Sequence, residues 1–189
     1  DDVMQDFAAV YSESTDPALR NTIVNTIGEA RLVDASPSKL REIVESIEEV
    51  QTIFSGESAH QKLVSQALGE AYYRLASDLR SGVSVDDEFW QLIEQAAVEY
   101  RTVLPWYKGK HGLSRSLRLQ ANQYAKQHRR EEALSCYEQI ESLEARFNVD
   151  LLSTGDKNRL EEYRHENITP TEPQETGQLI RQTQLSKYE

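Results

Sequence analysis

Apolar residues recur along this chain with the spacing of helices, at positions i, i+3, i+4 and i+7 of successive segments. The clearest segment follows Ser36 and Pro37, where the apolar positions share one helical face and glutamates occupy the other. The apolar positions are Leu40, Ile43, Val44, Ile47, Val50 and Phe54, and the glutamates are Glu42, Glu45, Glu48 and Glu49. No stretch of convincing length alternates apolar and polar residues as a half-buried strand does. The pattern predicts an all-α protein.

Start and stop signals divide the helical pattern into segments. Asp16 and Ser36 each precede a proline, a combination typical of an N-cap followed by proline in the first turn of a helix. Ser84 begins a Ser-x-x-acid capping pattern, and Pro105 ends the helix that follows it. We therefore expect a short first helix over about 4–11, helical hairpins over 17–54, 58–104 and 113–147, an aromatic and basic loop over 105–112, and a polar helix over 156–166.

We expect one helical domain over residues 1–166, because a chain of 189 residues can bury a real core. From Thr169 onward the composition shifts toward Thr, Pro, Glu and Gln, which is typical of a weakly ordered segment. The tail over 167–189 carries Glu172, Glu175 and Glu189. One hypothesis is that this tail lies in a basic groove of the same chain and blocks it.

Charge and composition narrow the class of protein. The chain has 21 basic and 32 acidic residues and a net charge of −11, which disfavours general binding to nucleic acid or anionic membranes. No apolar run reaches the ~18–20 residues that span a bilayer, and Asp1 and Asp2 do not resemble the start of a secretory signal. A single cysteine, Cys136, forms no internal disulfide, so nothing indicates an oxidising compartment. We expect a cytoplasmic protein.

The charges are unevenly placed along the chain. Residues 101–130 contain no Asp or Glu but carry eight cations. The rest of the chain therefore has 13 of the 21 basic residues and all 32 acidic residues. A block of one sign within a chain of the other sign favours an acidic partner, inside or outside the molecule. The hypothesis is that the helices gather these cations on one hollow face. The cations are Arg101, Lys108, Lys110, Arg115, Arg118, Lys126, Arg129 and Arg130.

Residues 114–147 resemble a tetratricopeptide (TPR) unit, a helix–turn–helix of 34 residues in which small side chains let two helices approach. A degraded copy of the spacing covers part of 58–104. Gln120 stands where the family has leucine and Ala145 where it has the closing proline. Such hairpins stack into a short solenoid whose concave face is lined by the first helices. The residues that carry the resemblance are Leu117, Gln120, Ala121, Tyr124, Ala133, Tyr137 and Ile140, with Leu68, Gly69, Tyr72, Ala96 and Tyr100 in the degraded copy.

The TPR resemblance implies that the first-helix face over 113–128 binds a peptide or partner helix. Arg118 and Asn122, one turn apart, resemble the basic residue and asparagine with which some family members hold a carboxylate. Arg offers a bidentate fork, and Asn can both donate to and accept from a peptide backbone. The alternative is that these cations pair with the chain's own acidic residues, such as Glu42–Glu49, Glu94 and Glu99. The predicted partner-binding residues on this face are Arg115, Arg118, Asn122 and Lys126.

The loop over 105–112 is a second candidate contact, since Trp106, Lys108 and Lys110 combine an aromatic ring with cations that could stack on a peptide or on bases. The alternative is that Trp106 covers the core while the lysines stay solvated. Trp90, by contrast, lies at helical spacing and is expected to pack between helices.

Groups suited to catalysis are sparse. The four histidines are scattered, with no His-x-x-x-His pattern and no cysteine pair, so we expect no metal and no cofactor. Cys136 lies in a predicted packed helix, where a buried and inert thiol is the ordinary case. The sequence therefore predicts a non-enzymatic interaction module, an adaptor or scaffold, that binds an acidic protein or peptide. The alternatives are a regulatory subunit that contacts nucleic acid and an acidic inhibitor or immunity-type protein. The oligomeric state stays open.

Overall fold

The computed structural model describes residues 2–28, 35–51, 58–80 and 84–168, and all regular structure in these ranges is helical. The described part of the chain is therefore all-α, as the hydrophobic pattern predicts. Of the predicted tail, residues 169–189 lie outside the described residues, and residues 167 and 168 continue the last helix. The helices are α1 (Asp2–Glu13), α2 (Pro17–Gly28), α3 (Pro37–Gln51), α4 (Ser58–Leu79), α5 (Asp87–Thr102), α6 (Tyr107–Lys126), α7 (Arg130–Phe147) and α8 (Thr154–Ile168).

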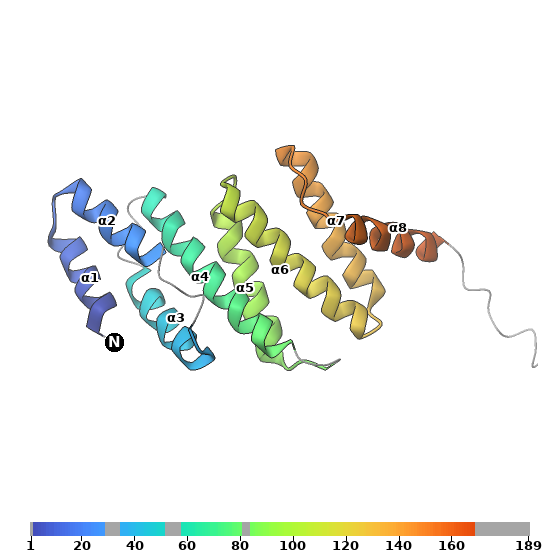
Figure 1. The fold of residues 1–189 in the computed structure, drawn as a ribbon, viewed down its shortest axis with the longest axis horizontal. Helices are drawn as coiled ribbons and strands as arrows, with labels where there is room; N and C mark the ends of the chain where they lie inside the picture. Colours follow the sequence, from blue (N-terminus) through green and yellow to red (C-terminus); the bar gives the residue numbers. More distant parts are fainter. Residues whose placement is uncertain (1, 29–34, 52–57, 81–83, 169–189) are drawn as a thin grey trace, which may run out of the picture.

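The helices follow one another along the long axis of the molecule (Figure 1). The most extensive packing joins α4 to α5 and α6 to α7, so the hairpins predicted over 58–104 and 113–147 are present. The hairpin predicted over 17–54 is not seen in the part of it that the structure describes, 17–28 and 35–51, because α2 and α3 pack mainly on α4 rather than on each other. α4 has 22 residues, more than α2 or α3, and it contacts both of them.

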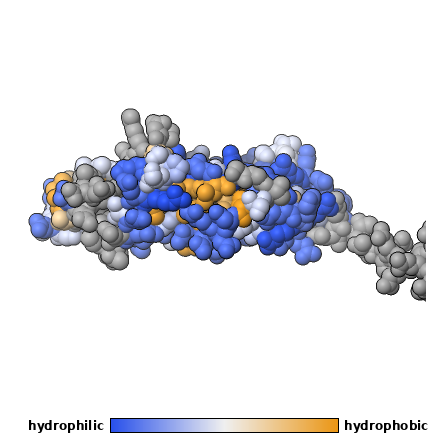
Figure 2. All heavy atoms as spheres, turned by 90° about the horizontal axis from the view of Figure 1, so that it is seen from below, coloured by the Kyte–Doolittle hydropathy of each residue, from blue (hydrophilic) through white to orange (hydrophobic). Residues whose placement is uncertain are grey.

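The core runs through the whole row of helices, from Tyr11 of α1 to Leu160 of α8. Tyr100, Tyr137 and Phe89 are the largest fully buried side chains. Seen from below the view of Figure 1, hydrophobic residues show between hydrophilic ones near the middle of the molecule (Figure 2). At this end of the helices the apolar core is therefore not wholly covered by polar side chains.

Tyr100 of α5 determines how closely α4 and α6 approach. A Cβ atom added to Gly69 of α4 would lie 3.2 Å from its ring, and one added to Gly112 of α6 would lie 2.2 Å from it. Gly112 was expected in a loop over 105–112, and that expectation was wrong, because α6 already begins at Tyr107. Two glycines within 107–112 suggest a loop by local propensity, but tertiary packing holds this segment as a helix against α5.

At two helix starts, polar side chains accept hydrogen bonds from backbone N–H groups of the first turn. Asp86 is the N-cap of α5, since its carboxylate accepts from the Phe89 backbone N–H at 3.1 Å, so the start expected at Ser84 was two residues early. At α8, Ser153 Oγ accepts from the Asp156 N–H at 3.2 Å, and Asp156 Oδ2 accepts from the Ser153 N–H at 3.0 Å. This reciprocal pair is a capping box, and it fixes the start of α8 against the end of α7.

Candidate functional site

Arg115, the first cation of the predicted binding face, is engaged inside the molecule. Its guanidinium donates to the Glu70 carboxylate of α4 and lies 4.6 Å from the centre of the Tyr73 ring. Glu70 also accepts from the Tyr100 hydroxyl at 2.9 Å and from Arg74 Nε at 2.9 Å. Burial alone would raise the pKa of Glu70, but the Arg115 charge and these hydrogen bonds outweigh it and lower the pKa overall. Arg115 therefore joins α6 to α4 and α5.

Arg118 is engaged in the other direction, toward α8. Its Nε donates to Asp156 Oδ2 at 2.8 Å, and its Nη2 donates to the Leu151 carbonyl at 2.6 Å. The Asp156 side chain is only 6% exposed. Burial raises its pKa, but the hydrogen bonds from Ser153 and the pairing with Arg118 outweigh that effect and lower the pKa. Arg118 thus ties α6 to the first turn of α8.

Asn122 and Arg118 do not form a joint binding pair for a partner protein, because the Asn122 side-chain oxygen already accepts hydrogen bonds within the chain. Asn122 Oδ1 accepts from Arg159 Nη1 of α8 at 2.9 Å and from the Tyr137 hydroxyl of α7 at 3.4 Å. Arg159 Nη1 also donates to the Tyr137 hydroxyl at 3.4 Å. These hydrogen bonds do not involve the amide NH₂ group of Asn122 or the Nε and Nη2 groups of Arg159. Arg115 and Arg118 therefore pair with acidic residues of the chain itself, which was the alternative to partner binding. Their carboxylate partners are Glu70 and Asp156, which were not among the acidic residues expected from the sequence.

A hollow with a volume of about 580 Å³ lies at the C-terminal end of α6, between the end of α4 and α8; we call it the basic hollow. Among the described residues that line it are three cations and no carboxylate. The Arg159 hydrogen bonds described above go to the Asn122 and Tyr137 oxygens and orient its guanidinium. The bond to Tyr137 and, more weakly, the Asp156 charge raise the pKa of Arg159. The lining residues are Arg80, Leu119, Asn122, Gln123, Ala125, Lys126 and Arg159.

The other predicted partner residues lie at the opposite end of α6. Lys108 is exposed, and Lys110 Nζ lies 5.6 Å from the centre of the Phe147 ring. Trp106 is 36% exposed, with Lys62 Nζ 5.5 Å from its ring centre, so it only partly covers the core. From Lys108 to Lys126 the helix rises by roughly 27 Å, at ~1.5 Å per residue. The structure therefore does not bring the two ends of α6 together into one compact site.

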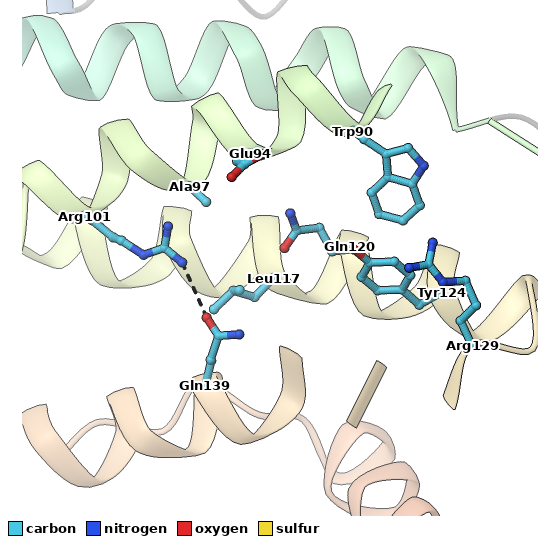
Figure 3. Close-up of a pocket in the computed structure, with 9 residues that line it drawn as sticks. All are labelled: Trp90, Glu94, Ala97, Arg101, Leu117, Gln120, Tyr124, Arg129 and Gln139. Atoms are coloured by element: carbon cyan, nitrogen blue, oxygen red, sulfur yellow. Dashed lines mark hydrogen bonds between the residues drawn. The ribbon is translucent and has the colours of Figure 1, made fainter. Parts of the chain in front are cut away.

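A second hollow, of about 310 Å³, lies between α5 and α7 with α6 behind it (Figure 3). Trp90 and Tyr124 stack there with ring centres 4.4 Å apart, and the Arg129 guanidinium lies 4.5 Å from the Tyr124 ring centre. Across the hollow, Arg101 Nη2 donates to Gln139 Oε1 at 3.4 Å. The two rings lie against each other, so they do not form an open cage, and Trp90 packs between helices as predicted.

A third hollow, of about 470 Å³, lies between α3 and α5 and is acidic. Glu48, Glu94 and Glu99 line it together with Tyr72, and no cation is found among the lining residues that the structure describes. The Tyr72 hydroxyl donates to Glu48. Burial, together with Glu48 and Glu99, raises the pKa of Tyr72, so this hydroxyl stays protonated as a donor. We call this surface the acidic groove.

The eight cations of 101–130 do not share one hollow. Arg101 and Arg129 line the hollow between α5 and α7, whereas Lys126 lines the basic hollow. The expectation of a single hollow face was therefore wrong, because consecutive residues of a helix point in different directions and α6 is surrounded by α4, α5 and α7.

Two cations of the basic hollow, Arg80 and Arg159, were missed from the sequence. Arg159 belongs to the polar helix expected over 156–166, which could have been considered as a further first helix. Arg80 directly follows α4, and no sequence pattern around it indicated a role in binding. Only the packing of α4 on α6 brings it near Lys126.

Cys136 is 5% exposed, and burial, with a smaller contribution from Glu132, raises its pKa to about 11. A thiol in this state is a poor nucleophile near neutral pH, as expected from the sequence. Within the described ranges, no three His, Cys, Asp or Glu side chains are placed so that they could hold a metal ion. None of the described helices combines the length and the apolar character needed to cross a membrane.

The described geometry defines an all-α protein that carries a basic hollow and a separate acidic groove. No protein-family model matches the sequence, and comparisons with curated proteins and with solved structures give no significant match. The residues of this chain and their geometry therefore carry the functional inference.

Proposed function

We propose that this protein is a non-enzymatic, TPR-like interaction module whose basic hollow holds an acidic peptide or an acidic surface of a partner protein. The observation that carries the proposal is that three cations, Arg80, Lys126 and Arg159, line one hollow of a chain with a net charge of −11. None of the described residues in this lining is a carboxylate. Positive potential in a concavity attracts a negatively charged ligand and raises its association rate. The binding face is thus narrower than the sequence suggests, since Arg115 and Arg118 hold helices together.

The arrangement of the helices supports the same proposal. Arg80, Lys126 and Arg159 come from the end of α4, from α6 and from α8. These helices alternate along the chain with α5 and α7, as the first helices of a stack of hairpins do. A short stack of this kind would present the hollow on its first-helix face, which is the face that the TPR resemblance implies for partner binding.

The test is titration of the full chain with a fluorescent peptide rich in glutamate at about 50 and 200 mM NaCl. Binding should be weaker at the higher salt concentration, because the pairs are solvent-exposed. The variant with Arg80→Glu, Lys126→Glu and Arg159→Glu should lose binding. The matched control reverses three exposed cations outside the hollow, Lys39, Arg41 and Lys157, and should keep it. Equal loss in both variants, or none in either, would reject the proposal.

The acidic groove favours a second candidate function, that of an acidic inhibitor that occupies a basic surface. Its support is that Glu48, Glu94 and Glu99 line the groove, with no cation in the described part of the lining. A lysine-rich peptide should then bind the chain, and the variant with Glu48→Lys and Glu94→Lys should not bind it. Binding that survives this variant would show that the groove is not involved.

A further inference from the structure

The donors around the basic hollow approach it from three separate elements. Arg80 follows α4, Asn122 and Lys126 belong to α6, and Arg159 belongs to α8. Arg and Lys side chains donate hydrogen bonds and accept none. Asn122 accepts from Arg159 with its side-chain oxygen, which leaves its NH₂ group as a further donor. A ligand in the hollow therefore meets cationic and amide donors from three elements, next to the Gln123 side chain.

Arg159 is also oriented before any ligand arrives. Its Nη1 is directed to the oxygens of Asn122 and Tyr137, at 2.9 and 3.4 Å. Tyr137 is 1% exposed, so it is a rigid support for the guanidinium. Fixing a long side chain in advance lowers the entropy that binding would otherwise cost.

The number of cations around the hollow discriminates between anions. A carboxylate carries one charge and two oxygens in one plane, whereas a phosphate monoester carries a charge of about −1.5 to −2 and three acceptor oxygens that point apart. Three cations from three elements suit the charge of a phosphate better than the single charge of a carboxylate. Arginine guanidinium groups also pair with phosphate oxygens bidentately.

We propose that the basic hollow recognises a phosphorylated side chain in a segment of a partner protein, with Arg80, Lys126 and Arg159 as its cationic ligands. This inference rests on the proposed interaction function and specifies the chemistry of the partner. A protein source is favoured over nucleic acid because a nucleic-acid backbone needs a continuous track of cations. Here Arg101 and Arg129 line a different hollow, and the chain as a whole carries a charge of −11.

The probes are three fluorescent peptide libraries of identical degenerate sequence whose central residue is phosphoserine, serine or glutamate. A single-stranded RNA of random sequence is the fourth probe. Each is titrated into the full chain by fluorescence polarisation. The phosphoserine library should bind at least about tenfold more tightly than the other two libraries, a difference of about 1.4 kcal/mol. The variant with Arg80→Ala, Lys126→Ala and Arg159→Ala should remove this preference, and Lys39→Ala, Arg41→Ala and Lys157→Ala should leave it unchanged.

The outcomes separate this inference from the proposed function. Equal binding of the glutamate and phosphoserine libraries through the hollow would overturn the phosphate inference and leave the acidic-partner function standing. RNA binding through the same residues without phosphopeptide binding would overturn both in favour of a nucleic-acid contact. No binding of any probe would also overturn both. Thermal unfolding of each variant establishes that a lost signal does not come from an unfolded chain.

Discussion

Tyr100 shows at the scale of a single residue how this protein joins packing to charge. Its ring lies between Gly69 and Gly112, while its hydroxyl donates to Glu70, the carboxylate that also holds Arg115. One side chain thus contacts three helices and helps to orient a partly buried ion pair. Because the Tyr100 side chain is closely packed on every side, adding one methyl group nearby is expected to change the free energy of unfolding.

Gly112→Ala should destabilise the protein by about 1–3 kcal/mol, because the new Cβ atom would overlap the fully buried Tyr100 ring and force it to move. This cost outweighs the ~1 kcal/mol by which alanine exceeds glycine in helix propensity. The free energy of unfolding in urea measures it. Gly155→Ala in α8 is the matched control, since its Cβ atom would lie 3.8 Å from Ser153 Oγ, and it should stabilise slightly. Stabilisation by both substitutions would contradict the packing described here.

Glu70 makes the stability depend on pH in a definite direction. Its pKa in the folded chain is lower than the ordinary 4.5, so its contribution is fully present above about pH 4.5 and is lost as the pH falls through the folded pKa. Asp156 acts in the same sense. Urea unfolding at several pH values between about 7 and 3 should show this loss. Glu70→Gln should be less stable than the natural chain at pH 7 and should lose less on acidification; an unchanged pH profile would mean that the pair contributes nothing.

At the scale of helices, the cations of α6 serve as connectors between elements. Arg115 reaches α4 and Arg118 reaches α8, so one face of α6 is tied to the helices on both of its sides. Glu144 of α7 adds to the connection, since its Oε1 accepts from the Leu151 and Leu152 N–H groups at 2.6 Å each. The short link between α7 and α8 is therefore held by charged groups as well as by the buried Leu151 and Leu152 side chains.

Arg118→Ala should loosen α8 more than the rest of the molecule. The substitution leaves the buried Asp156 carboxylate without its cation and the Leu151 carbonyl without its donor, a loss of about 1.5–3 kcal/mol for hydrogen bonds of a charged group. Hydrogen exchange with mass spectrometry should show faster exchange in α8 and little change in α4 and α5. Lys157→Ala, also in α8 but exposed, is the control and should change little. Equal exchange in both variants would mean that Arg118 does not hold α8.

At the scale of the whole molecule, the helices form a row with a well-buried middle and weaker ends. α5 packs between α4 and α6, and Phe89, Ile93 and Ala96 are fully buried there. α1 packs chiefly on α2 and α3 and contributes Tyr11 to the core. Structures in which each element contacts mainly its neighbours open locally from the ends.

Amide hydrogen exchange of the natural chain should therefore proceed fastest in α1 and slowest in α5 and α6. The expected order follows from how many sides of each helix are covered by neighbours. The measurement is exchange time courses on peptides from each helix at neutral pH. Uniform exchange across α1, α5 and α6 would indicate a single cooperative unit and would argue against a row of semi-independent contacts.

Much of the fold could be predicted from the sequence because helix formation depends on local spacing. Apolar periodicity and capping residues predict α2, α3, α4 and α8 within a few residues of their observed starts. The misplaced loop over 105–112 has a physical cause: Gly109 and Gly112 weaken a helix locally, but they are required where the backbone of α6 approaches Val103 and Tyr100. No local pattern contains that information.

The sequence by itself determined the all-α class, the positions of most helices and the concentration of cations in 101–130, because these depend on near neighbours and composition. Only the tertiary structure decided which cations are used internally and which face a hollow. Arg115 and Arg118 meet carboxylates that lie 45 and 38 residues away along the chain, whereas Arg80 and Arg159 join Lys126 across three elements. Such pairings depend on how helices pack side by side, and side-chain direction around a helix decides the partner of each charge.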